Sequence, residues 1–340
     1  MKTALSIFTA LVLCILAGCD GAAEKKEPLT GKIQPLKEGK ELLTVDFQEG
    51  RSLRYRFVSS RDIALDWDPK KSKTRPGRSS IDKSSESMDM VVSYTPIEVD
   101  PYGINTIKAT IESVRATRSK SQGGRAARRD AVESLPGKTF TLKVNATGKI
   151  EDYSQLDDLI RQTGEKAFRT SSRAGRIKEP DLIADFIGTQ WYLWDSVSSI
   201  EKPIEGVSVG QSWSSKLSLP TPMVMRKARD VTYTLDEIRQ SGKDRLAVIS
   251  SSYSLADSVP RDWPIPYTGS FQMSGTFGFF RGYKILSLKG QGEDLFNIDA
   301  GRTEQYNQQY RMQLSVSLPG PIGASPEITI NQKITMQLLN

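Results

Sequence analysis

The sequence of 340 residues contains no histidine and only two cysteines. Without histidine the chain cannot build a Ser-His-Asp or Cys-His catalytic centre, an HExxH zinc site or an imidazole switch. Both cysteines, Cys14 and Cys19, lie within the first nineteen residues. The rest of the chain therefore has neither disulfides nor thiolate metal ligands, and we expect no metal site and no cofactor.

Phosphate-binding loops are also absent from the sequence, because neither GxGxxG nor GxxxxGK[ST] occurs in it. Gly275, Gly278 and Gly282 form a glycine-rich stretch, but they alternate with phenylalanines and no Lys-Ser or Lys-Thr pair follows. Glycines in such a pattern indicate a kinked or bulged strand. Nothing in this stretch predicts nucleotide binding.

An apolar stretch at residues 4–17 follows the positive charge of Lys2. It is too short for the roughly 30 Å hydrocarbon core, which takes about 20 helical residues, but it suits a secretory signal. It runs into Leu16, Ala17, Gly18 and Cys19, a tetrapeptide that resembles the lipobox of bacterial lipoproteins. The resemblance implies cleavage between Gly18 and Cys19, which makes residues 1–18 a signal peptide. It also implies lipidation of the Cys19 thiol, so that acyl chains make the membrane a partner.

The alternative is an ordinary secretory signal in which the cysteine occurs by chance. A transmembrane helix is disfavoured, because the polar Asp20 follows at once. An Asp at this position resembles the inner-membrane retention signal of enterobacterial lipoproteins. We therefore expect a lipid-anchored protein of the cell envelope, with a weak preference for the inner membrane.

Residues 19–43 are charged and interrupted by Pro and Gly, which predicts a flexible tether behind the lipidated cysteine. From residue 44 onward apolar and polar residues alternate with a period of two. This pattern indicates antiparallel strands with one wet face, so the fold is expected to be mainly β, of the α+β class. The clearest alternating series are Leu53-Tyr55-Phe57, Met88-Met90-Val92-Tyr94, Phe140-Leu142-Val144, Tyr310-Met312-Leu314-Val316-Leu318 and Ile328-Ile330-Ile334-Met336-Leu338. Gln332 interrupts the last of these series, between Ile330 and Ile334.

Two segments follow a helical period instead. The first covers about 155–169; Ser154 with Asp157 resembles a capping box, and Leu156, Ile160 and Thr163 share one face. The second covers about 181–200 and ends before Pro203. This second helix is unusually apolar and contains two tryptophans, so it is expected to pack against a sheet. A role as an aromatic ligand platform is the less favoured alternative.

The chain contains an internal repeat. Val92, Tyr94, Thr95, Glu98 and Gly103 match Val231, Tyr233, Thr234, Glu237 and Gly242 at a constant offset of 139 residues. Both copies predict two strands joined by a turn at the glycine, in hairpins of the same length. Further hairpins are expected at 140–150 and 295–302. The repeat predicts duplicated antiparallel β units that form curved sheets: a first unit at 44–153, a helical insert at 154–202 and a second unit at 203–340. Coincidence among simple alternating strands is the alternative.

Taken together, the lipobox, the two Tyr-Thr hairpins, the turn at 144–150 and the Val-Ser-Val-Gly-Gln-Ser-Trp stretch at 207–213 resemble a family of uncharacterised bacterial lipoproteins, catalogued as a domain of unknown function. The similarity covers roughly residues 45–338. It implies an envelope location and a duplicated β-rich fold. No activity is known for that family, so it assigns no catalytic residue.

Two long stretches rich in Ser, Gly and Pro, at 66–87 and 115–137, are expected to be loops. Outside the cytoplasmic membrane their basic residues would meet no nucleic acid, but they would meet anionic lipid or acidic wall polymers. The simpler explanation, that the charges keep the protein soluble, is favoured over binding. The candidate contacts are Lys70, Lys71, Lys73, Arg75, Arg78, Arg115, Arg118, Lys120, Arg125, Arg128 and Arg129.

Three functions remain open at this point. The favoured one is a membrane-anchored, non-enzymatic module for binding or scaffolding. The alternative is a carrier that holds a lipid or another apolar ligand between the sheet and the 181–200 helix, which requires an apolar cavity there. A glycan-processing enzyme is disfavoured, because it needs two carboxylates across a cleft, and the sequence offers only Asp66 with Asp68 and Asp157 with Asp158.

Overall fold

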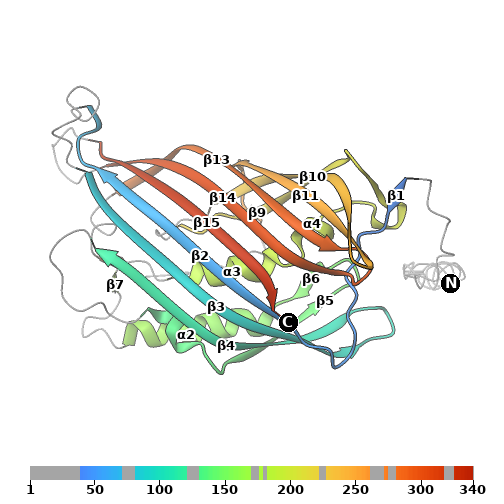
Figure 1. Cartoon of the computed structure of the whole chain (residues 1–340). Helices are drawn as coiled ribbons and strands as arrows, with labels where there is room; N and C mark the ends of the chain where they lie inside the picture. The colour runs from blue at the N-terminus through green and yellow to red at the C-terminus, as the bar shows by residue number, and fades with distance from the viewer. Residues whose placement is uncertain are drawn as a thin grey trace, which may run out of the picture. The chain divides into compact units, whose positions relative to one another are not determined.

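The computed structural model describes residues 39–70, 81–120, 130–169, 176–178, 182–221, 227–260, 272–274, 281–317 and 325–339. Eleven strands of this described part form one sheet, in the order β6-β5-β4-β3-β2-β15-β14-β13-β11-β10-β9, and all neighbours run antiparallel (Figure 1). The prediction of a mainly β fold with curved antiparallel sheets is confirmed. The strands are β2 (Leu53–Asp66), β3 (Ile81–Val99), β4 (Asn105–Lys120), β5 (Thr139–Val144), β6 (Ile150–Asp152), β9 (Ser212–Ser218), β10 (Ala228–Ser241), β11 (Asp244–Leu255), β13 (Arg281–Asn297), β14 (Arg302–Ser317) and β15 (Glu327–Leu339).

Helices cover one face of this sheet, which we call the inner face. They are α2 (Ser154–Arg169), α3 (Ile183–Tyr192) and α4 (Asp195–Ser198). Within the described residues, the short 3₁₀ turns are η2 (Ala131–Ser134) and η3 (Pro203–Glu205). Outside the large sheet, β1 (Lys40–Glu41) pairs antiparallel with β8 (Val207–Ser208), and β7 (Arg176–Lys178) pairs in parallel with β12 (Gln272–Ser274).

The two predicted β units belong to one continuous sheet. In the order of the sheet, β2 to β6 form one meander and β9 to β15 form another, apart from the short β12. The first strand of the first meander, β2, pairs with the last strand of the second, β15, from Arg54 opposite Leu339 to Asp66 opposite Glu327. This pairing joins the beginning of the folded part to its end.

The repeated segments occupy equivalent hairpins, β3–β4 and β10–β11. Each first strand has a bulge at the same repeat position, between Pro96 and Glu98 in β3 and between Leu235 and Glu237 in β10. The prediction of equal hairpin lengths is wrong. Pro96 pairs with a residue eleven positions further along the chain, Ile107, whereas Leu235 pairs with one fourteen positions further, Ile249. The offset of 139 residues therefore holds on the first strands and is lost beyond the turn.

The β5–β6 and β13–β14 hairpins that follow the repeats also form as predicted. Their turns contain Gly148 and Gly301, both with positive φ. The segment just before β2 lies between these two turns: the Val45 N–H donates to the carbonyl of Ala146, and the Asp46 N–H donates to that of Gly301. A side chain at Gly301 would collide with the Asp46 backbone, so glycine allows this close approach.

The second predicted helix is broken into two. Instead of one helix over 181–200, α3 ends at Tyr192 and α4 begins at Asp195. The Trp194 ring, only 3% exposed, packs edge-on against Phe47 and Tyr94. The expected core role of this segment is confirmed. The Trp194 ring is packed into the core at the point where the helix is interrupted.

The first helix begins at Ser154 as predicted, and Leu156, Ile160 and Thr163 are buried on its inner side. The capping box is wrong: the Asp152 carboxylate accepts a hydrogen bond from the Ser154 N–H, so Asp152 holds the helix start. This hydrogen bond also lowers the pKa of Asp152.

Three predicted boundaries are corrected. The tether cannot extend to residue 43, because β1 pairs with β8 at residues 40–41 and Leu43 is buried. The loops expected at 66–87 and 115–137 are shorter, since β3 begins at Ile81 and β4 continues to Lys120. Hydroxyl pairs, such as Ser85 with Ser119, join these polar strand ends in place of apolar alternation.

Candidate functional site

A row of polar and small residues crosses the inner face of the sheet at right angles to the strands. Each member lies directly opposite the next on the neighbouring strand. This row, the polar belt, separates a first apolar cluster under the helices from a second apolar cluster. Its members are Arg118, Glu86, Arg61, Gln332, Tyr310, Gly290 and Tyr253.

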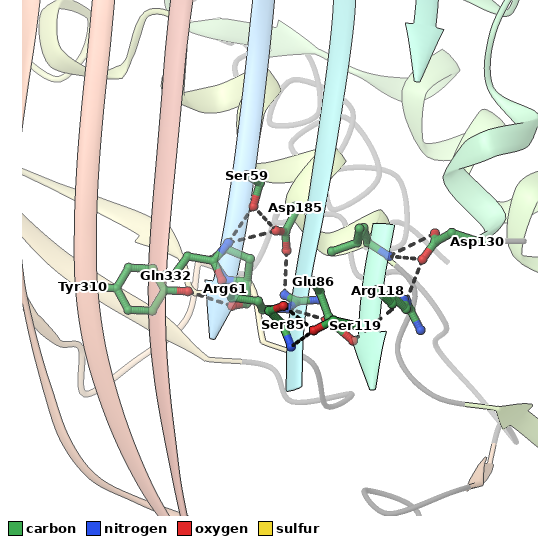
Figure 2. A network of polar contacts seen from close by, with 12 residues as sticks. Ser59, Arg61, Ser85, Glu86, Arg118, Ser119, Asp130, Asp185, Tyr310 and Gln332 are labelled. Carbon is green, nitrogen blue, oxygen red and sulfur yellow. Dashed lines mark hydrogen bonds and ion pairs between the residues drawn. The ribbon is translucent and has the colours of Figure 1, made fainter. Parts of the chain in front are cut away.

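One half of the belt is a buried charge network (Figure 2). The Arg61 guanidinium donates to Glu86 at 2.6 Å and to Asp185 of α3 at 3.0 Å, and all three side chains are at least nine-tenths buried. Burial opposes the charge of Arg61, but the two carboxylates outweigh it and raise the pKa of Arg61. Asp185 also accepts hydrogen bonds from Ser59 and, at 2.9 Å, from Gln332. The network therefore fastens α3 to β2, β3 and β15.

Arg118 extends this network toward the start of α3. Its guanidinium lies 2.6 Å from the Asp130 carboxylate and 3.8 Å from that of Glu86. Asp130 in turn accepts from the backbone N–H of Leu182, the residue before α3. Burial raises the pKa of Asp130, against the opposite effect of the Arg118 charge. Arg118 was predicted as a contact for anionic surfaces, but its charge is directed to these two carboxylates.

The other half of the belt adjoins a buried arginine with a different environment. Arg229, at an inward position of β10, is completely buried. Its guanidinium carbon lies 4.6 Å from the ring centre of Tyr253, 5.1 Å from that of Tyr192 and 5.3 Å from that of Tyr310. We call these four residues the tyrosine cage. Aromatic faces attract a cation at such distances, and more strongly where water is excluded.

Two glycines make the cage possible. A Cβ on Gly290 or Gly292 would meet neighbouring atoms at 2.5–2.6 Å, and Tyr253 lies within 3.0 Å of both built positions. The bare backbone of β13 therefore provides the surface on which the Tyr253 ring lies.

Two buried carboxylates lie close together, Asp195 at the start of α4 and Asp294 on β13. Asp195 accepts hydrogen bonds from Tyr233 at 2.7 Å and Ser215 at 2.9 Å, and Asp294 accepts one from Ser196. Burial raises the pKa of Asp195 to about 6 and that of Asp294 to about 7. They differ from Asp185 in that no arginine of the described chain donates to them.

The outer face of the sheet carries three adjoining hollows of about 540, 540 and 840 Å³. Neighbouring hollows share lining residues, so together they form one outer trough across eight strands from β4 to β10. Four basic and two acidic side chains line it, and the rest of its outward side chains are almost all amides or hydroxyls. Its outward lining is Ser60, Asp62, Ala64, Lys83, Ser85, Ser119, Thr232, Thr234, Ser250, Ser252, Lys289, Gln291, Glu293, Gln305, Asn307, Gln309, Arg311, Thr329, Asn331 and Lys333.

Lys289 and Arg311 lie directly opposite each other in this trough, on β13 and β14. Neither forms an ion pair with any residue that the structure describes. Like charges in direct cross-strand register destabilise a sheet. Asn331 lies opposite Arg311 on β15 and continues the row.

The predicted surface contacts are only partly within the described residues. Lys70 and Arg115 are exposed, and Lys120 is the last residue of β4. The residues of the predicted signal cleavage and lipidation site, Gly18, Cys19 and Asp20, lie outside the described residues. So do the remaining basic candidates, which are Lys71, Lys73, Arg75, Arg78, Arg125, Arg128 and Arg129.

None of the carboxylates considered for glycan chemistry lines one of the hollows given above for the described residues. Asp157 and Asp158 are exposed on α2, while Asp66 and Asp68 are half-buried at the end of β2. Trp67, between them, donates its indole N–H to Asp82 at 2.8 Å. Within the described ranges no group of three or more acidic residues could hold a metal ion, and no helix is both long and apolar enough to cross a bilayer.

Residues 206–210 read Gly-Val-Ser-Val-Gly, a pattern that in hydrolases places a nucleophile on a strand-to-helix turn. Here Ser208 lies in the two-residue strand β8, opposite Lys40. With no histidine in the chain, this serine also lacks the usual base. The pattern does not form a nucleophile elbow.

Sequence reasoning missed Arg61, Glu86 and Arg229. Each breaks the alternation of its strand by placing a charge at an inward position, and that was the available signal. Of the inward polar residues, only Gln332 is recognised in the sequence as an interruption of an apolar series.

No protein-family model and no curated protein matches the chain. Solved structures resemble it weakly. Lipovitellin, in a structure of its lipid–protein interactions, aligns with a TM-score of 0.45 and 9% identity over 87% of this chain and 26% of its own. Pseudomonas aeruginosa OpdQ aligns with a TM-score of 0.20 and 9% identity over 85% and 98%. The chain spans about a quarter of the lipovitellin chain, and neither likeness bears on function.

Proposed function

We propose that this chain is a lipid-anchored protein of the bacterial cell envelope that binds a linear acidic polymer, such as a wall polymer, along its outer trough. The observation that carries the proposal is the opposed pair Lys289 and Arg311, which has no acidic partner among the described residues. A polyanion lying across both side chains would remove their mutual repulsion. The role is binding and not catalysis.

The remaining lining of the trough supports the same class of ligand. Amide and hydroxyl side chains both donate and accept hydrogen bonds, which suits a polymer rich in hydroxyl groups. The excess of basic over acidic side chains favours a polymer with negative charge. The trough crosses many strands, so it offers successive contacts to an extended chain.

The anchor is proposed from the sequence alone. Acyl chains on Cys19 would hold the protein at a membrane, and Asp20 favours the inner one. Two or more chains make such an anchor stable, since each buried CH₂ contributes about 0.8 kcal/mol. The resemblance to uncharacterised bacterial lipoproteins supports the same location.

A carrier of an apolar ligand remains the second candidate. The space between α3 and the sheet is filled by packed rings, such as Phe186 on Phe140 and Tyr192 on Tyr306, which argues against a ligand at the place first expected. The second apolar cluster contains no helix residue of the described chain, and its members are at most 6% exposed, so a carrier would hold its ligand in an already buried region.

The outer trough is tested with the whole chain carrying Cys19→Ser, so that no acyl chains interfere. Calorimetric titration at low salt would compare polygalacturonate with neutral dextran. We expect polygalacturonate to bind and dextran not to bind. Arg311→Glu should weaken polygalacturonate binding about tenfold, because the polymer loses one cation and meets a new anion.

Arg311→Glu also separates binding from folding, since the new carboxylate lies opposite Lys289. An opposite-charge pair at this position should raise stability by about 0.2–1 kcal/mol while binding falls. Lys243→Glu, at the exposed β10–β11 turn, is the matched control and should bind normally. Equal binding of dextran, or unchanged binding by Arg311→Glu, would contradict the proposal.

A further inference from the structure

Arg229 combines three properties that rarely occur together in a protein interior. Its side chain is completely buried, and none of its guanidinium nitrogens has a hydrogen-bond partner in the described chain. No carboxylate forms an ion pair with it there. Buried charges are ordinarily paired, since the cost of desolvation is large and must be offset.

The tyrosine cage offsets part of this cost, but it supplies no acceptor for the guanidinium N–H groups. The aromatic faces attract the positive charge, whereas the planar fork of N–H donors prefers carboxylate or phosphate oxygens. Two further polar groups lie nearby, the hydroxyl of Tyr192, whose ring faces Arg229, and the amide nitrogen of Gln308, and these two interact with each other. The Gln308 oxygen already accepts from Tyr306, and the Tyr306 ring stacks on Tyr192. The unpaired donors of the cage are therefore the guanidinium N–H groups of Arg229, for which an anion is the suitable partner.

The cage also adjoins a buried apolar cluster. Tyr310 belongs both to the cage and to the second apolar cluster, in which Met312 and Leu314 follow it on the inner face of β14. Ile328 and Ile330 of β15 continue the cluster beside them. A small hydrated anion gains nothing from such neighbours, whereas the alkyl part of an amphipathic anion would bury its surface there.

We propose that Arg229 binds the anionic group of an amphipathic ligand, a carboxylate or a phosphate ester, whose alkyl part lies against the second apolar cluster. This site is on the inner face and is independent of the outer trough. Either assignment can therefore fail without the other. The ligand class is defined by its charge and its apolar body, and the two anionic groups are distinguished by the experiment.

The test uses the whole chain carrying Cys19→Ser and three probes of equal chain length: decanoate, decyl phosphate and 1-decanol. Calorimetric titration at pH 7.5 measures their affinities. At least one of the two anions should bind ten times more tightly than decanol, and the tighter anion identifies the natural head group. In Arg229→Gln this preference should disappear, while the affinity for decanol stays the same.

The control variant is Arg239→Gln, which removes an exposed arginine from the same strand, and it should keep the preference. Should Arg229→Gln fail to fold, Arg229→Lys replaces it. The lysine keeps the charge, so anions should still bind more tightly than decanol, though with lower affinity. Equal affinities of all three probes for the parent chain would overturn the proposal. So would an anion preference that survives in Arg229→Gln, or one that is lost in folded Arg229→Lys.

Discussion

Arg61 and Arg229 both occupy inward positions of the same sheet, yet their surroundings differ completely. Arg61 lies between two carboxylates, and one of them, Asp185, belongs to the helix that covers it. Arg229 lies among tyrosine rings and forms no ion pair or hydrogen bond with a carboxylate of the described chain. The first arrangement satisfies its charges within the fold and holds α3 in place. The second leaves donors available, which is what a binding site needs and a structural tie does not.

The largest effect is expected from removing the carboxylate that ties α3 to the belt. Asp185→Ala should lower the free energy of unfolding by about 3–5 kcal/mol, because Arg61 would keep its charge in a buried site and lose a partner. Urea unfolding followed by tryptophan fluorescence measures this. A loss below 1 kcal/mol would show that the charge network does not hold the helix.

A pH profile sharpens the comparison between the paired and unpaired carboxylates. Burial raises the pKa of Asp294 to about 7 and that of Asp195 to about 6, well above the unfolded value near 4. Between pH 4 and pH 7 the folded state therefore binds more protons than the unfolded state. Stability contributed by these groups is present at low pH and is lost as the pH rises through this window.

Melting temperatures measured from pH 5 to pH 8 test whether stability falls as the pH rises. The parent chain should lose stability on the alkaline side, and Asp294→Asn should flatten the profile because its amide does not titrate. A profile that is identical in Asp294→Asn would contradict the raised pKa.

The glycines under the cage provide a smaller effect. Gly292→Ala would place a methyl group within 2.8 Å of three atoms, including the Tyr253 hydroxyl, and should cost about 1–3 kcal/mol through overpacking. Gln291→Ala, whose side chain lies in the outer trough, is the control and should change stability little. Equal losses for both substitutions would show that the cage does not depend on the bare β13 backbone.

The sequence predicted much of this frame for physical reasons that act locally. Alternation identified β2, β3, β5, β14 and β15, because each strand buries one face and wets the other. The repeat identified two equivalent hairpins, and the structure adds a bulge at the same position in both, between Pro96 and Glu98 and between Leu235 and Glu237. Local patterns did not reveal the β2–β15 pairing, which joins residues that are far apart in the chain.

Most residues of the candidate sites could not be predicted from the sequence. The belt depends on register across seven strands, and register between distant strands cannot be read from one segment alone. The polar ends of β3 and β4 looked like loops, since ionic and hydroxyl pairs replace the apolar pattern there. The signal for these sites was a charged residue at an inward position of an alternating strand, as at Arg61 and Arg229.

The smallest effect is expected from an outer-face ion pair between β2 and β3, the two strands that carry Arg61 and Glu86 on the inner face. Arg56 of β2 pairs with Asp89 of β3 at 2.5 Å, but both side chains are exposed. Solvent screens such pairs, so Asp89→Asn should leave the urea midpoint unchanged. A loss comparable to that of Asp185→Ala would mean that burial does not distinguish the two networks.

The two arginines themselves allow the most direct measurement. Arg61→Met and Arg229→Met remove the same charge from the same face and can be compared by urea unfolding without ligand. Arg61→Met should lose about 3–5 kcal/mol, because Glu86 and Asp185 would be left buried without their cation. Arg229→Met should be neutral or more stable than the parent, because it removes a buried charge that no carboxylate pairs. If Arg229→Met is the more damaging of the two, Arg229 is a structural residue and the account is wrong.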